Sequence, residues 1–368
     1  MKITLCMIVK NEEDNIKMCL TNAFTIVDNA VIVDTGSTDN TKNIIKEFNG
    51  NIKLIEHKWN DDFSEARNIS LDNADGDWIL VLDADEEIFG HKETLINYIR
   101  HSKNEAYDIK GVNKVDDGNA NSLFYNRFFR NKGYKYYMPI HEQLNVDGNQ
   151  VGTLDDKMAK IVHYGYSKKE FEKKDKINRN LRILISEYNK DTENSFICYH
   201  IGATYASSGD YTSALSYFIQ SYEIGLKKGF GGYYYELLKR IAQCIYILKD
   251  YNLCIDFLMQ FLKDEKLKEF TDLYYILGSC CFELKDYDNA ELMFNKCIEL
   301  GENKSFPTFE GRGTFLPKLM IARIYLKRDK VEKAKGYYLE VAEHKEKLGK
   351  DIIDEINLYI NENKSVKK

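Results

Sequence analysis

Three short apolar runs in the first part of the chain constrain its fold more than any other feature. They span residues 3–9, 30–34 and 78–83 and are rich in branched side chains. Such near-continuous runs are expected for strands buried on both faces of a sheet. Helical patterns lie between them at residues 13–24 and 41–48, and the second follows residues suited to capping a helix. This alternation predicts an α/β domain with a parallel sheet covered by helices on both faces.

Each apolar run leads into polar residues. They occupy positions 10–12, 34–37 and 83–85. In a parallel α/β sheet, ligands bind at the carboxyl ends of the strands, where the loops meet. We therefore expect the three polar segments to converge on one crevice.

Two carboxylates, Asp83 and Asp85, follow the most apolar of the three runs. Residues at i and i+2 of an extended segment project from the same side and can share one divalent cation. Oxygen ligands suit Mg²⁺ or Mn²⁺, which usually carry substrate phosphates. Most pairs of this kind in proteins are instead loop or capping residues, so the pair by itself does not decide between a metal site and a structural role.

The second half of the chain contains a repeat marked by the dipeptide Asp-Tyr. Its Asp residues stand at positions 210, 250 and 286, at intervals of 40 and 36 residues. A small residue precedes each Asp by eight positions, and a small and a large residue follow it by four and eight. In order, the copies contain Gly202, Ala214 and Phe218, then Ala242, Cys254 and Leu258, then Gly278, Ala290 and Phe294, and a weaker fourth copy has Ala322, Tyr325, Ala334 and Tyr338.

The small residues of this repeat would let two antiparallel helices approach, and the large ones would fill the gap to the next pair. The spacing resembles the tetratricopeptide repeat. The usual proline is missing and the intervals exceed the usual 34 residues, so we expect irregular loops. An unrelated helical bundle is the alternative.

Between these regions, residues 111–166 carry turn residues between short aromatic runs, which predicts mixed strands and loops that complete the first domain. Residues 168–190 have a helical stripe of apolar side chains. We expect a first domain at residues 1–166, a connecting helix at 167–190 and an all-α repeat domain at 191–368.

Composition excludes several classes of protein. With 43% hydrophobic and 30% charged residues, the chain is expected to be globular rather than largely disordered. A net charge of −6 gives no basic excess for nucleic acid or anionic lipid. No apolar run approaches the roughly 20 residues of a membrane span, and no export signal is recognised, so we expect a cytoplasmic protein. The eight cysteines form no C-x-x-C pair and are expected to be reduced and to act as small hydrophobic side chains.

Four motifs in order resemble family 2 glycosyltransferases, which have the nucleotide-sugar-binding α/β fold known as GT-A. They occupy residues 7–13, 31–39, 62–68 and 83–85. The motif at 62–68, Asp-Phe-Ser-Glu-Ala-Arg-Asn, is typical of a subgroup fused to tetratricopeptide repeats. Peptide S-glycosyltransferases that modify bacteriocins of the sublancin type belong to that subgroup. The resemblance implies that residues 1–166 form a glycosyltransferase domain.

The resemblance assigns roles to five residues of the predicted crevice. Asp34 would bind the uracil of a nucleotide sugar, Glu12 would approach the nucleoside, and Arg67 would contact the base or diphosphate. Asp83 would face the ribose and the metal, with Asp85 as the direct metal ligand. The alternatives are a helix cap at Asp34, a surface ion pair at Arg67 and a solvated side chain at Glu12.

Two histidine-containing segments complete the predicted site. His141 and Glu142 match a His-Glu pair of similar enzymes, and Glu142 is the candidate base that removes the acceptor's proton. The alternative for Glu142 is a salt bridge or a contact behind a metal ligand. His163 resembles a late histidine that completes metal coordination, where a neutral imidazole suits Mn²⁺ better than Mg²⁺. A lone histidine is otherwise structural.

The expected reaction is transfer of a sugar from a UDP-sugar to a Cys, Ser or Thr side chain of a peptide or protein. The resemblance implies a Mn²⁺ or Mg²⁺ ion and inversion at the sugar, and the repeats would hold the acceptor. Two alternatives stay open: a cell-envelope glycan or lipid-linked acceptor, and a non-catalytic adaptor that binds partners through its repeats. No membrane span and no nucleic-acid partner is expected.

Overall fold

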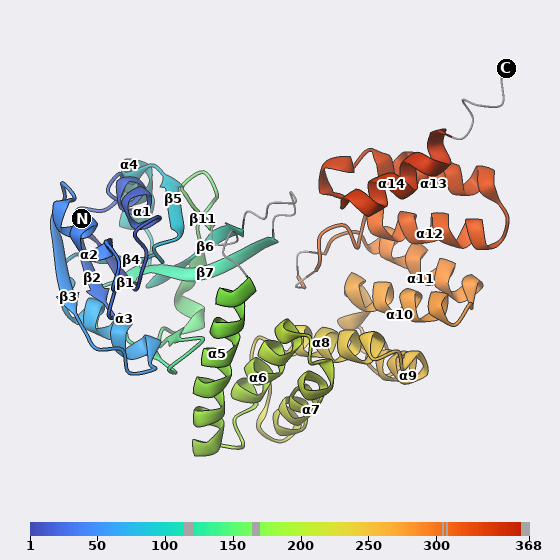
Figure 1. Cartoon of the computed structure of the whole chain (residues 1–368), viewed down its shortest axis with the longest axis horizontal. Helices are drawn as coiled ribbons and strands as arrows, with labels where there is room; N and C mark the ends of the chain where they lie inside the picture. The colour runs from blue at the N-terminus through green and yellow to red at the C-terminus, as the bar shows by residue number, and fades with distance from the viewer. Residues whose placement is uncertain (114–120, 164–169, 304, 307, 362–368) are drawn as a thin grey trace. The chain divides into compact units, whose positions relative to one another are not determined.

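The computed structural model describes residues 1–113, 121–163, 170–303, 305–306 and 308–361. The chain divides into two compact units, Met1–Lys173 and Lys174–Lys368 (Figure 1). Residues 164–169 lie outside the described residues, and they include the three that follow His163 and the first three of the predicted connecting helix.

The first unit alternates strands and helices at its start and is mostly strand after that. Its helices are α1 (Ile16–Ala23), α2 (Thr41–Glu47), α3 (Phe63–Asp72) and α4 (Lys92–Arg100), with a short 3₁₀ turn at Gly148–Gln150. Its strands are β1 (Ile3–Val9), β2 (Asn29–Asp34), β3 (Ile52–Glu56), β4 (Trp78–Val81), β5 (Glu86–Gly90), β6 (Ala106–Asn113), β7 (Asn121–Arg130), β8 (Tyr136–Tyr137), β9 (Gln143–Leu144), β10 (Val151–Thr153) and β11 (Ala159–His163).

The main sheet has the strand order β3-β2-β1-β4-β7-β6-β11-β5, with β10 beside β6, while β8 and β9 form a separate ribbon. β1 pairs in parallel with both β2 and β4. The three predicted strands are therefore immediate neighbours, and their carboxyl ends meet at one edge. β7 enters antiparallel between β4 and β6, which makes the sheet mixed. The expected α/β fold is confirmed. Each of the three predicted strands and two predicted helices begins and ends within three residues of the observed element.

Both faces of the central strands are buried, as their unbroken apolar sequence predicts. On one face, Leu5 and Met7 of β1 pack with side chains of α1 and α4. On the other face, Cys6 and Ile79 pack with Leu71 of α3. Figure 1 shows α1 and α4 on one side of the sheet and α3 on the other. The loops at the strand ends are thus held from both sides.

In the described residues of the second unit, all regular secondary structure is helical. Its helices are α5 (Glu170–Lys190), α6 (Ser195–Ser208), α7 (Tyr211–Lys228), α8 (Tyr234–Ile247), α9 (Tyr251–Phe261), α10 (Thr271–Glu283), α11 (Tyr287–Leu300), α12 (Phe315–Lys327), α13 (Val331–Ala342) and α14 (Lys350–Asn361), with 3₁₀ turns at Leu267–Glu269 and Lys345–Lys347. Consecutive helices pack as pairs, beginning with α6 and α7. The predicted repeat architecture is confirmed.

The small residues of the repeat mark the closest approach of paired helices. A Cβ atom at Gly202 would lie 2.7 Å from the ring of Phe218, and one at Gly278 would lie 3.0 Å from the ring of Phe294. Both rings are fully buried. Any larger side chain at these two positions would push the helices of a pair apart, which explains the spacing of the motif.

The Asp of each repeat marker begins the second helix of a pair. Asp210, Asp250 and Asp286 each accept a hydrogen bond from the backbone N–H three residues later. This is the bonding of a helix N-cap. The residue before each Asp has a positive φ, of 86° at Gly209 and 66° at Lys249, so the chain reverses there through one left-handed residue.

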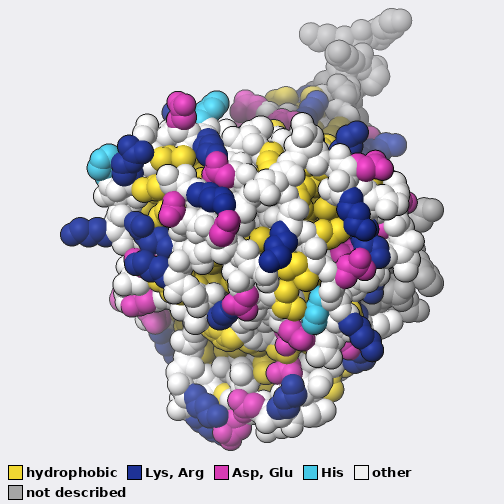
Figure 2. All heavy atoms as spheres, turned by 90° about the vertical axis from the view of Figure 1, so that its left-hand side faces the viewer, with side chains coloured by type: hydrophobic (Ala, Val, Ile, Leu, Met, Phe, Trp, Pro, Cys, Tyr) yellow, Lys and Arg dark blue, Asp and Glu magenta, His cyan; other side chains and the backbone are white. Residues whose placement is uncertain are grey.

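All eight cysteines are free, as predicted, and all are buried. None of the helices in the described part of the chain is both long and apolar enough to span a bilayer. The face of the molecule in Figure 2 carries acidic and basic side chains interspersed with small apolar areas.

Candidate active site

Asp34 ends β2 and holds the loop that follows it. Its Oδ1 accepts hydrogen bonds from the backbone N–H groups of Gly36 at 3.0 Å and Ser37 at 2.9 Å. This local turn needs the left-handed Gly36, with φ of 106°. The helix α2 begins later, at Thr41, and the Asp39 side chain bonds its first N–H, so the helix-cap interpretation of Asp34 is wrong.

The second carboxylate oxygen of Asp34 has a different environment. Oδ2 is buried and has no hydrogen-bond partner among the described residues. A buried acceptor left unpaired costs about 1–3 kcal/mol. Such an atom at the carboxyl end of a central strand is suited to accept a hydrogen bond from a ligand.

Glu12 lies in the loop after β1, which is bonded to the loop after β2. Its backbone N–H donates to Thr41 Oγ1 at 2.7 Å, and its carboxylate accepts from Asn15 Nδ2 at 2.8 Å. The preceding Asn11, with φ of 56°, accepts from the backbone N–H of Thr38. These bonds place Glu12 on the same edge of the sheet as Asp34.

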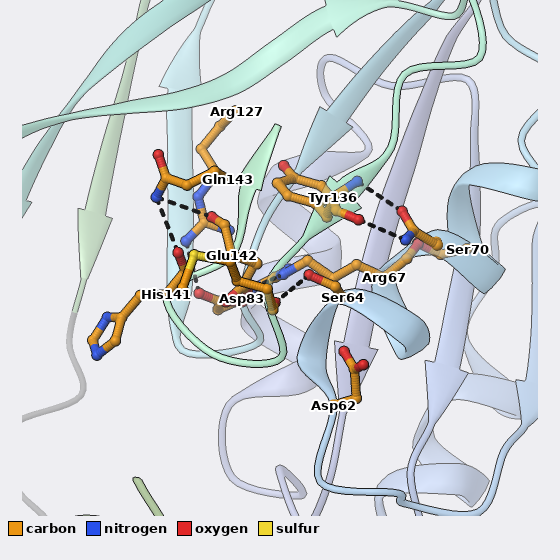
Figure 3. A network of polar contacts seen from close by, with 12 residues as sticks. Asp62, Ser64, Arg67, Ser70, Asp83, Arg127, Tyr136, His141, Glu142 and Gln143 are labelled. Atoms are coloured by element: carbon orange, nitrogen blue, oxygen red, sulfur yellow. Dashed lines mark hydrogen bonds and ion pairs between the residues drawn. The ribbon is translucent and has the colours of Figure 1, made fainter. Parts of the chain in front are cut away.

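Arg67 is the centre of a buried polar network (Figure 3). It lies on α3, whose first turn is capped by Asp62. Its Nη2 donates to Asp83 Oδ1 at 2.8 Å, and its Nε donates to Glu142 Oε1 at 2.5 Å. The Arg67 side chain is only 8% exposed, so the alternative of a surface ion pair is wrong.

The Nη1 atom of Arg67 is also buried, and it has no hydrogen-bond partner among the described residues. Arginine carries five N–H donors in a planar fork that suits phosphate and carboxylate oxygens. Arg67 therefore joins two predicted site residues and keeps donors for a third group.

Asp83 is held by a second arginine that the sequence interpretation missed. Arg127 of β7 donates to Asp83 Oδ2 at 2.9 Å and lies 3.7 Å from Glu86. Tyr136 was missed as well, and its ring lies 5.8 Å from the Arg67 guanidinium carbon. The sequence did offer a signal for Arg127, because a charged side chain within an aromatic strand needs a carboxylate partner. The sequence does not say which carboxylate that partner is.

The two arginines keep Asp83 ionised. Burial alone would raise the pKa of Asp83, but the charges of Arg127 and Arg67 outweigh it and hold this pKa well below its usual range. Burial alone would also raise the pKa of Glu142, but the charge and hydrogen bond of Arg67 outweigh burial, so the pKa of Glu142 is lowered. At Glu86 burial outweighs the attraction of Arg127, so the pKa of Glu86 is raised.

Asp85 and His163 form a separate pair beside this network. The His163 Nε2 atom lies 3.0 Å from Asp85 Oδ2, because β11 pairs with β5 directly after Asp85. The hydrogen bond with Asp85 raises the pKa of His163. An oxygen and a nitrogen donor at this separation fit two neighbouring positions around one divalent ion. Among the described residues, no group of three or more such side chains is placed to hold a metal.

His141 and Glu142 lie in the loop between β8 and β9, which is fastened to α3. The Ser64 hydroxyl donates to the carbonyl of Met138, and the backbone N–H of Phe63 donates to the carbonyl of Pro139. His141 has a left-handed backbone with φ of 53°. In Figure 3 its imidazole points away from the Arg67 network that Glu142 joins. Burial lowers the pKa of His141, so its ring is neutral near pH 7.

The fold and this cluster define a class that comparison with known proteins identifies. The sequence profile of glycosyl transferase family 2 matches residues 4–206, and that of the tetratricopeptide repeat matches residues 197–224 and 271–303. The first match covers more than half of the chain. The chain therefore belongs to glycosyl transferase family 2 and carries tetratricopeptide repeats in its second half.

Individual relatives share parts of this arrangement. The chain is 30% identical over 241 residues to a TPR repeat-containing protein of Synechococcus elongatus, an alignment that covers 62% of this chain and 57% of that protein. It is 28% identical over 196 residues to the SPbeta prophage-derived glycosyltransferase SunS of Bacillus subtilis, covering 52% and 46%. The chain thus spans about half the length of the curated relatives that it matches.

Among solved structures, S. aureus TarS 1–349 in complex with UDP-GlcNAc is 16% identical, with a TM-score of 0.40, and the match covers 81% of this chain and 91% of that one. MamA matches 48% of this chain and 92% of its own length with 18% identity and a TM-score of 0.39.

Proposed function

We propose that this chain transfers a sugar from a UDP-sugar to a Cys, Ser or Thr side chain of a peptide or protein, with a divalent metal ion and with inversion at the sugar. The observation that carries the proposal is the buried Oδ2 atom of Asp34, which has no hydrogen-bond partner among the described residues and lies at the same edge of the sheet as Asp83. Membership of glycosyl transferase family 2 supports the reaction class.

Asp34 would select the base of the donor. Uracil has one ring N–H donor between two carbonyl groups, and a carboxylate oxygen is a matching acceptor. Asp34 Oδ1 is already used by two backbone N–H groups, so Oδ2 would receive the base. Glu12, from the neighbouring loop, would approach the nucleoside, while Asp83 would face its ribose.

The diphosphate would lie between Arg67 and the Asp85–His163 pair. The Nη1 of Arg67, which has no hydrogen-bond partner in the part of the chain that the structure describes, would donate to a phosphate oxygen. Asp85 and His163 would hold Mn²⁺ or Mg²⁺, and such an ion usually completes its shell with phosphate oxygens and water. When bound, the ion would offset the charge that develops on the departing diphosphate.

Glu142 and His141 would serve the acceptor. Glu142 is the proposed base, and its ion pair with Arg67 makes it a weak one because its pKa is lowered. A thiol needs little help, since its thiolate is accessible near neutral pH, whereas a hydroxyl depends on the base more strongly. His141 beside it, neutral near pH 7, would contact the acceptor.

The test is release of UDP from a panel of UDP-sugars with Mn²⁺, followed by intact-mass measurement of candidate acceptor peptides. We expect at least one UDP-sugar to be consumed, and Asp85→Asn to lose this activity. Asp72→Asn, at the exposed end of α3, is the matched control and should retain it. Absence of both turnover and UDP binding in the unaltered protein would contradict the proposal. Transfer to envelope glycans but to no peptide would refute the peptide acceptor.

A further inference from the structure

The repeat unit contains a cavity of about 390 Å³ that no part of the donor chemistry uses. It is lined by the first helices of three successive pairs, α6, α8 and α10, by Tyr211 at the start of α7, and by the segment that leads into α12. The lining therefore crosses several repeats instead of lying within one. A ligand that follows it would be extended.

Both charged side chains that line this cavity in the described residues are arginines, Arg240 and Arg312. Arg312 is fixed in place, because its Nη1 donates to the fully buried Asp272 at 2.8 Å. Its guanidinium carbon also lies 5.0 Å from the ring centroid of Tyr275 and 5.3 Å from that of Phe309. A guanidinium held between rings and a carboxylate loses little freedom when it binds an anion.

The two carboxylates that pair with these arginines, Asp272 and Glu236, also contact Lys239. Asp272 also accepts from the backbone N–H of Phe309 at 3.2 Å and lies 3.8 Å from Lys239 Nζ. Glu236 binds Lys239 at 2.6 Å and Arg240 Nε at 2.7 Å. Three cations thus face two carboxylates, and two of these cations, Arg240 and Arg312, line the cavity.

The rest of the lining is aromatic and aliphatic. Tyr211, Tyr246 and Tyr275 contribute rings, and Ile247 is 43% exposed at the rim. A cavity with fixed N–H donors, surplus positive charge and an apolar rim suits a carboxylate that is carried next to an apolar side chain. Asp and Glu side chains within an extended peptide provide this combination.

We propose that this cavity, the Arg240–Arg312 pocket, binds an acidic side chain of the acceptor peptide, with a neighbouring apolar side chain against Ile247. The proposal rests on the proposed function for the identity of the peptide as acceptor. The carboxylate would receive N–H groups of both arginines, and the peptide chain would run across α6, α8 and α10.

The test uses two labelled nonapeptides, blocked at both ends, with a central Leu-Glu-Tyr or Leu-Gln-Tyr and otherwise identical. Fluorescence anisotropy with the full chain should give about tenfold tighter binding of the Glu peptide, since hydrogen bonds to ionised groups are the stronger ones. Gln243→Glu, a change of similar shape that adds a negative charge to the lining, should abolish the preference.

Arg240→Gln should weaken the preference as well, and it leaves Glu236 paired with Lys239. Lys296→Gln on α11, outside the lining, is the matched control and should keep it. Equal binding of the two peptides, or binding only of a version with a free C-terminus, would overturn the proposal. UDP binding measured on the same variants separates the pocket proposal from the proposed function. A protein that binds UDP but shows no preference for the Glu peptide would refute only the peptide pocket.

Discussion

The candidate active site of the sheet unit and the repeat motif of the second unit use aspartate in opposite ways. In the sheet unit, Asp83 bonds to Arg67 and Arg127, which are 16 and 44 residues away. In the repeat unit, Asp286 bonds to a backbone N–H three residues later. The repeats are therefore specified by local spacing, and the candidate active site by pairing between distant strands and helices. Substitutions in the candidate active site should therefore affect both stability and sugar transfer, whereas substitutions in a repeat should affect the stability of its own helix pair.

The largest effect is expected for Arg67→Met in the sheet unit. It would leave Asp83 and Glu142 buried with one cation fewer, and breaking a buried ion pair on one side costs about 3–5 kcal/mol. Urea unfolding should show this loss, together with loss of sugar transfer. Arg100→Ala, an exposed arginine on α4, should leave both unchanged. A stable Arg67→Met protein would mean that the network is not structural.

In the repeat unit, Gly202→Ala should destabilise the first helix pair. The new Cβ would contact the Phe218 ring at 2.7 Å and the Ala214 carbonyl oxygen at 3.0 Å, and overpacking of a core costs about 1–3 kcal/mol. Gly336→Ala is the matched change in α13, where a new Cβ meets nothing within 4 Å. That variant should gain about 0.5–1 kcal/mol, because glycine inside a helix is unfavourable. Equal effects at both sites would refute the close-approach explanation.

The helix caps give a smaller, additive effect. Asp250→Ala should cost about 1 kcal/mol by removing the N-cap bond of α9. The fourth repeat has Lys330 at this position, with no side-chain cap bond. Lys330→Asp should therefore stabilise the chain by a similar amount, as thermal unfolding can measure. If the two changes shifted stability in the same direction, the caps would not follow the repeat pattern.

The smallest effect is a contrast in pH dependence. The pKa of Glu142 is lowered by Arg67 despite burial, so its ionised form stabilises the fold above its unfolded pKa of about 4.3, and this stability is lost as the pH falls through the lowered folded pKa. Burial raises the pKa of Asp272, so its ionisation instead costs stability as the pH rises above its unfolded value of about 3.9.

Unfolding free energies measured between pH 3 and pH 6 should therefore change slope in opposite directions. Glu142→Gln should make the increase of stability with pH less steep, and Asp272→Asn should make it steeper. Slopes that move in the same direction in both variants would show that one of these two carboxylates has the opposite environment.

The sequence predicted the parts of the fold that depend on local patterns. Apolar runs located β1, β2 and β4, and the regular spacing of small residues and Asp located the helix pairs. The sequence also placed Asp34 and Asp83 at one sheet edge, because neighbouring parallel strands end together.

The pairing within the site was beyond prediction from the sequence. β7 inserts antiparallel next to β4, and only this long-range choice brings Arg127 to Asp83. Likewise, Arg67 reaches Glu142 because the loop after β8 is fastened to α3. Residue types and spacing indicate charges that need partners, but the topology of the sheet decides which partners they find.

The most direct test of the account is calorimetric binding of UDP with Mn²⁺ to the unaltered chain, Asp34→Asn and the control Asp72→Asn. The asparagine has one acceptor oxygen, so either the Gly36 turn or the base loses its partner. We expect UDP binding to be weakened about 10-fold or more in Asp34→Asn, as for a lost hydrogen bond to a charged group, and to be unchanged in Asp72→Asn. Absence of UDP binding in the unaltered chain, or equal binding by all three, would contradict it.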